Sequence, residues 1–133
     1  MTDKQQVAGD DEMKEFTPEE LEMLSFGLIG SAGQARSLAF SALKAARAGD
    51  FEHADELITQ SKEAAIASHD QQTKLLVREA NGIHTPVDVM LVHAQDHLMT
   101  AMLAQELIEE LIHLYRCKED RACAGPVAED TQA

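Results

Sequence analysis

The chain of 133 residues is long enough for one modest domain and too short for two domains with separate hydrophobic cores. Its net charge of −13 disfavours docking onto nucleic acid or anionic lipid, because both need clustered cations on the protein. No apolar run approaches the roughly 20 residues that span a bilayer, and the polar N-terminus is unlike a signal peptide, so we expect a soluble, cytoplasmic protein without direct membrane insertion.

The first helix is predicted to follow an acidic, disordered tail at residues 1–16. Thr17-Pro18-Glu19-Glu20 places an N-capping threonine, a proline at the first helical position and a glutamate where a capping box needs it. Apolar residues then recur at three-or-four spacing from Leu21 to Ala46, which predicts one buried helical stripe. Gly49 provides a C-terminal stop.

The second helix is predicted from an N-cap at Asp50 to about Ala80, with the same apolar period running to Leu75 and Leu76. Asn81-Gly82 is a turn dipeptide. Thr85-Pro86-Val87-Asp88 then repeats the capping pattern of the first helix and predicts the start of a third.

The third helix carries more apolar residues than one buried stripe needs. Its inner stripe includes Ala94, Leu98 and Ile108, and a second wide face contains Val89, Leu91, Val92, Leu103, Leu107, Leu111 and Leu114. Either the helix is buried at the centre of a monomer, or the second face is covered by copies of the chain. Short connections predict an all-α, up-down-up antiparallel three-helix bundle over 17–117, followed by a flexible tail at 118–133.

A polar cluster interrupts the third helix at VHAQDHLMT. His93, Asp96, His97 and Thr100 stand at i, i+3, i+4 and i+7, so their side chains share one helix face. Two imidazoles at this spacing can ligate a metal, although no third ligand cluster accompanies them. An imidazole can also act as a nucleophile that takes and returns a group, and a structural polar layer is the remaining interpretation.

Three glycines inside the first helix also need an explanation, because each glycine in a helix interior destabilises the helix by roughly 1 kcal/mol relative to alanine. Gly27, Gly30 and Gly33 permit either the close approach of another helix or room for a bulky anionic group at the helix surface. Spacing favours the first explanation and leaves the second open.

Several segments resemble one family. GQARSLA at 33–39, the Gly49-Asp50-Phe51 turn and VHAQDHLMT at 92–100 are similar to the lactose/cellobiose-type IIA proteins of the bacterial sugar phosphotransferase system, and to their diacetylchitobiose/cellobiose branch above all. The similarity runs from about Glu20 to Arg116.

This resemblance implies a homotrimer formed through the third helix, in which His93 accepts a phosphoryl group from the phosphocarrier protein HPr. It implies transfer onward to a cysteine of the cognate IIB component, which works with the membrane-bound IIC component during uptake of a disaccharide. Asp96 then lies at the three-fold axis, where three copies share a metal ion, commonly Mg²⁺. Gln95, His97 and Thr100 are candidate hydrogen-bond donors to the phosphoryl oxygens, and the sequence leaves open which of them faces His93.

Two rival functions follow from the residues alone. A noncatalytic helical adaptor would use the polar cluster as a structural layer and the acidic surface to recruit basic partners. A metal-dependent hydrolase would need a second ligand cluster, which the sequence does not offer at a telling spacing.

Overall fold

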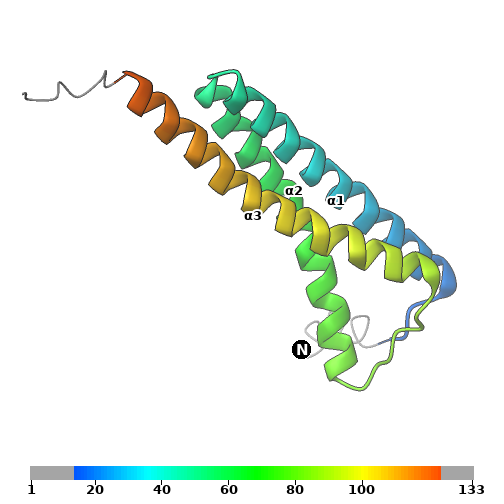
Figure 1. Cartoon of the computed structure of the whole chain (residues 1–133). Coiled ribbons are helices and arrows are strands. Elements are labelled where there is room, and N and C mark those ends of the chain that lie inside the picture. Colours follow the sequence, from blue (N-terminus) through cyan, green and yellow to red (C-terminus); the bar gives the residue numbers. More distant parts are fainter. Residues whose placement is uncertain (1–13, 124–133) are drawn as a thin grey trace, which may run out of the picture.

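The computed structural model describes residues 14–123, which form three long helices and, over that range, no strand. They are α1 (Pro18–Arg47), α2 (Phe51–Ala80) and α3 (Val89–Cys123). In Figure 1, α1 and α3 run side by side in the same direction while α2 returns in the opposite one. The predicted up-down-up bundle is confirmed. Helix α1 packs along both other helices, whereas α2 and α3 contact each other much less.

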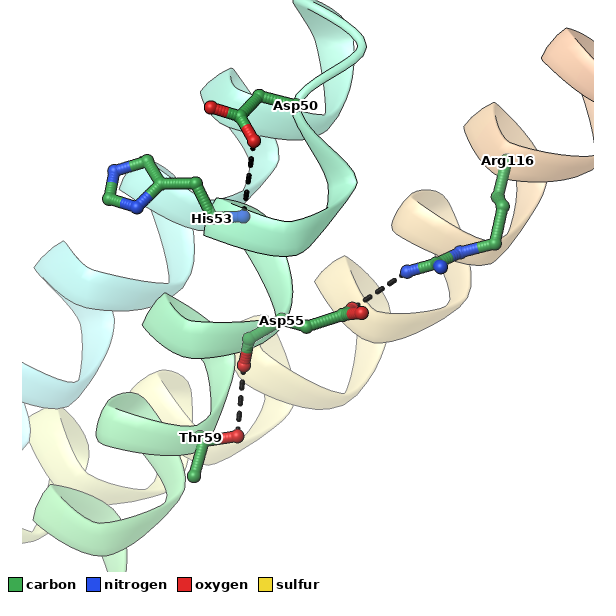
Figure 2. A network of polar contacts seen from close by, with 5 residues as sticks. All are labelled: Asp50, His53, Asp55, Thr59 and Arg116. Carbon is green, nitrogen blue, oxygen red and sulfur yellow. Dashed lines mark hydrogen bonds and ion pairs between the residues drawn. The ribbon is translucent and has the colours of Figure 1, made fainter.

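Local capping chemistry fixes the starts of α1 and α2. Thr17 and Glu20 form the predicted capping box: the Glu20 amide donates to Thr17 Oγ1 at 3.2 Å, and the Thr17 amide donates to Glu20 Oε2 at 2.8 Å. Asp50 Oδ1 accepts the His53 amide at 3.2 Å (Figure 2). The turn before α2 needs Gly49, whose φ of 81° lies in the left-handed region.

The predicted start of α3 at Thr85-Pro86 is wrong by one turn. Helix α3 begins at Val89, where Asp88 Oδ1 accepts the Leu91 amide at 2.7 Å. An aspartate is a stronger N-cap than threonine, and its charge suits the positive end of the helix. The Thr85 amide instead donates to Glu79 Oε2 at 3.2 Å.

The loop before α3 is fastened to the end of α2 through Glu79. His84 Nδ1 lies 2.6 Å from Glu79 Oε1, and this hydrogen bond, together with the one from the Thr85 amide, holds the pKa of Glu79 below its ordinary value. Because the pKa is lowered in the folded chain, the stabilising contribution of Glu79 is present above its unfolded pKa. It is lost as the pH falls through the folded one.

The core follows the predicted stripes and is built largely of small side chains. On α1 the buried residues are Leu21, Ser25, Leu28, Ala32, Ala35, Ala39, Ala42 and Ala46. They meet two sets of α3 residues, one around Leu98 and one around Ile108. Alanine lets the α1 and α3 backbones approach closely, which fixes the side chains that flank this seam.

Polar contacts join α2 to its neighbours. Arg116 Nη2 donates to Asp55 Oδ1 at 2.7 Å (Figure 2). The Arg116 guanidinium also lies 5.0 Å from the Phe51 ring centroid. The buried Ser61 hydroxyl donates to the Ala35 carbonyl at 2.7 Å. The Arg116–Asp55 pair is largely exposed, so it contributes little stability but helps to set how α3 lies against the start of α2.

The predicted tail at 1–16 is anchored at its inner end. Phe16 packs against the core cluster that contains Leu21, and the Arg78 guanidinium lies 4.0 Å from the Phe16 ring centroid. An apolar residue before the N-cap that packs near the fourth helical residue is a hydrophobic staple, which explains the difference. Residues 1–13 lie outside the described residues.

The predicted C-terminal tail at 118–133 begins as helix. Helix α3 continues to Cys123, because Lys118, Glu119 and Arg121 are good helix formers and the first breakers are Gly125-Pro126. Residues 124–133 lie outside the described residues.

Candidate functional site

His93 and His97 form the centre of the candidate site, within the first three turns of α3. Their rings meet edge to face, with centroids 4.5 Å apart and planes at 90°. His93 is exposed and His97 is half-buried. The His93 ring is therefore steadied on one side by His97 while it stays exposed to an incoming group, as an imidazole nucleophile needs.

Asp96 and Thr100 share this face, as the spacing predicted. The Asp96 side chain is exposed. The Thr100 hydroxyl donates to the carbonyls of Asp96 at 2.8 Å and His97 at 3.3 Å, so its one proton is used within its own helix. Thr100 thus supports the backbone beneath the site.

Gln95 points to another side of α3, because two residues turn an α-helix through about 200°. Its Oε1 accepts a hydrogen bond from Gln72 Nε2 of α2 at 2.6 Å, and Gln72 also approaches the Met99 sulfur at 3.6 Å. The structure does not bring Gln95 to His93 within one subunit. Its role at the phosphoryl group stays a prediction.

An exposed apolar surface surrounds the polar cluster. Val92, Met99 and Leu103 are each more than half exposed, and the surface continues along α3 through Leu107, Leu111 and Leu114. We call these six residues the outer face of α3. In the described residues 14–123 these side chains stay 40–62% exposed, so the interpretation of α3 as a buried central helix is wrong there; of the predicted second face, only Leu91 is buried.

The remaining histidines stand apart from this cluster. His69 is exposed on α2, where it lines a hollow together with residues of α3. His53 and His113 lie on exposed helix faces, and His84 lies in the loop before α3. In the described part of the chain, no three His, Cys, Asp or Glu side chains gather into a group that could hold a metal ion.

Sequence reasoning missed the other wall of the site. His97 lines a hollow together with residues of α1, among them Arg36 and Lys44. The motif GQARSLA at 33–39 contains Arg36, but no spacing along one helix could show that it lies beside His97, some sixty residues away in sequence.

The fold and the site define a small all-helical bundle whose third helix presents a histidine pair in an exposed apolar face. Residues 23–116 match the family described as the lactose/cellobiose-specific IIA subunit of the phosphotransferase system, and the chain belongs to this family. It is thus a phosphotransfer component of a sugar transport system. None of the helices in the described range is both long and apolar enough to cross a membrane.

Three relatives illustrate the similarity. The N,N'-diacetylchitobiose-specific EIIA component of Escherichia coli K12 is 54% identical over 97 residues, which cover 73% of this chain and 84% of the relative. The lactose-specific EIIA component of Lactococcus lactis is 44% identical over 98 residues, covering 74% and 93%. The solution structure of the E. coli IIA(Chitobiose)–HPr complex matches with a TM-score of 0.66 at 50% identity, covering 75% and 97%.

Proposed function

We propose that this protein is a cytoplasmic phosphoryl carrier that accepts a phosphoryl group from phospho-HPr on His93 and passes it to a cysteine of a cognate IIB component. In the first step a bond forms between an imidazole nitrogen of His93 and phosphorus, while the bond to the donor breaks and the donor keeps its electron pair. The second step reverses these roles toward the IIB thiolate. The IIB component would then serve a membrane-bound IIC component during uptake of a disaccharide of the chitobiose, cellobiose or lactose class.

The observation that carries this proposal is the exposed His93 ring held against His97. A carrier has little covalent chemistry to accelerate, so it needs a nucleophile that is accessible and held in one orientation. A histidine in a structural polar layer would instead be covered and hydrogen-bonded within the bundle. The relative solved in complex with HPr supports the choice of donor.

The test is phosphorylation with phosphoenolpyruvate, enzyme I and HPr. We expect acid-labile label on the wild-type chain and none on His93→Ala, while the matched variant His113→Ala, changed at another exposed histidine of α3, keeps full labelling. Label that persists in His93→Ala would move the site elsewhere. A wild-type chain that is never labelled would favour the adaptor.

We also propose a homotrimer through the outer face of α3, with a Mg²⁺ ion shared by three copies of Asp96 at its axis. The exposed apolar surface supports self-association, since a patch of this extent is unusual on a monomer. Asp96 suits the ion because Mg²⁺ prefers carboxylate oxygen, and the exposed Asp96 carboxylate would be tripled by three-fold symmetry. The ion would offset the repulsion between the three carboxylates.

Asp96→Leu tests this arrangement. Replacing buried charge with apolar surface should keep or raise trimer stability, by up to about 4 kcal/mol, and should abolish the effect of Mg²⁺ and of chelator on the thermal midpoint. Asp70→Leu, at an exposed position on α2, should keep the wild-type response to Mg²⁺. An Asp96→Leu chain that dissociates would contradict the proposal.

A further inference from the structure

A hollow of about 570 Å³ lies between α1 and α3 beside His97. Helix α1 supplies every lining residue except His97 itself. The α1 residues are Gly33, Arg36, Ser37, Phe40, Ser41 and Lys44. Two cations, two hydroxyls and an imidazole thus face one open space.

The charge of this hollow is opposite to that of the chain. Its lining contains no carboxylate, although the whole chain carries a net charge of −13. Three other hollows of the described chain each include at least one acidic side chain. Cations gathered without a counter-charge in an acidic protein favour an anionic ligand.

Arg36 and Lys44 also have no acidic partner of their own. The Arg36 guanidinium lies 5.7 Å from the Phe40 ring centroid, a contact that steadies it and leaves its N–H donors available. Over residues 14–121, neither Arg36 nor Lys44 forms an ion pair with another side chain. Both side chains can therefore turn to a ligand without breaking an existing ion pair.

The hollow reaches the candidate site through His97, whose ring lines it and also contacts the His93 ring at 4.5 Å between centroids. Gly33 leaves it open on the α1 side: a Cβ there would meet no atom of another helix within 4 Å. The expectation that close helix approach explains this glycine is therefore wrong. Room for an anionic group at the helix surface, the second explanation, fits the geometry.

We propose that this hollow is the anion subsite of the carrier, and that Arg36 binds the phosphoryl group while His93 carries it. The inference rests on the proposed function of His93. A phosphoryl group adds roughly −1.5 to −2 charges and three strong acceptor oxygens, which the planar fork of an arginine matches better than a point charge does. Lys44 lies about 12 Å further along α1, so it adds to the positive field without reaching the same oxygens.

The test compares two arginine variants of α1. Arg36→Gln and Arg47→Gln remove the same charge from the same helix, but Arg47 lines a different hollow, near Gly49 and Tyr115. Both side chains are exposed, so both variants should fold, which circular dichroism checks. Arg36→Lys is a third variant that keeps the charge and loses the fork.

The main readout is a ³¹P NMR titration of the phosphoryl group on His93, identified as the resonance missing from His93→Ala. Loss of a neighbouring cation should raise the pKa of the phosphoryl group by about 1 unit in Arg36→Gln, by less in Arg36→Lys, and not at all in Arg47→Gln. Transfer from phospho-HPr should slow about tenfold or more in Arg36→Gln, by less in Arg36→Lys, and not in Arg47→Gln. An unchanged pKa in Arg36→Gln, or an equal rise in Arg47→Gln, would overturn the proposal.

Two phosphoryl donors separate this inference from the proposed function. Phosphoramidate, a small donor that releases ammonia as the bond to the histidine nitrogen forms, is used beside phospho-HPr. If phosphoramidate labels His93 and phospho-HPr does not, the proposed donor is wrong. The pKa of the phosphoryl group in Arg36→Gln then still tests whether Arg36 binds that group. If HPr labels His93 and the shift is absent, the carrier function stands and the Arg36 subsite fails. Label on His93 from neither donor overturns both.

Discussion

The inner and outer faces of α3 are both apolar but differ in what covers them. Ala94, Leu98 and Ala101 are at most 2% exposed and alternate small with large side chains, which lets α1 pack closely. Val92, Met99 and Leu103 are large and 54–56% exposed. The histidine pair and Asp96 stand on the outer face. One side of α3 therefore contributes to the subunit core. The other side carries the candidate site and the apolar surface proposed for self-association.

The largest expected effect comes from breaking the inner face. Leu98→Ala should lower the free energy of unfolding by about 2–5 kcal/mol, because the removed methyl groups leave a cavity that alanine-rich surroundings cannot fill. Urea denaturation at a fixed protein concentration measures the change. Leu103→Ala, which shortens the same residue type on the outer face, should cost clearly less when the protein is dilute enough for the proposed trimer to dissociate. Equal losses would mean that the two faces are buried alike.

A charge on the outer face should separate association from folding. Leu103→Glu should abolish the proposed trimer, since burying an unpaired carboxylate costs several kcal/mol and symmetry repeats that cost in every copy. Sedimentation velocity would show a monomer that keeps its helical circular dichroism. Leu76→Glu places the same change on exposed α2 and should leave the trimer intact. A trimer that survives Leu103→Glu would place the interface elsewhere.

The inner face and the bounds of α1 and α2 could be predicted from the sequence because local chemistry determines both. The Thr17 capping box, the Asp50 cap and the period of the α1 stripe each depend on neighbours within a few residues. Local signals mislead where two of them compete. At the start of α3 both Thr85 and Asp88 could serve as the N-cap, and Asp88 is the residue that does.

Properties that depend on how whole helices are rotated against each other could not be predicted. Leu76 continues the apolar period of α2 but is 62% exposed, since α2 lies mainly against α1 and contacts α3 much less. The approach of Arg36 to His97 follows from the way α1 and α3 pack side by side (Figure 1). The polar cluster of α3 was visible in the sequence, whereas the cationic wall facing it was not.

The smallest expected effect tests the boundary between the two faces, where Gln95 meets Gln72. A double-mutant cycle of Gln72→Ala and Gln95→Ala should give a coupling energy of about 0.5–1.5 kcal/mol, the net value of one hydrogen bond between half-buried amides. Exposed Gln60 paired with Gln95 in the same cycle should show none, because the two do not touch. If the Gln72–Gln95 cycle is also additive, Gln95 is free to leave α2, and its predicted place beside the phosphoryl group gains support. A clear coupling energy would mean that Gln95 serves the packing of α2 on α3, leaving the site of a single subunit to His93, His97 and Arg36.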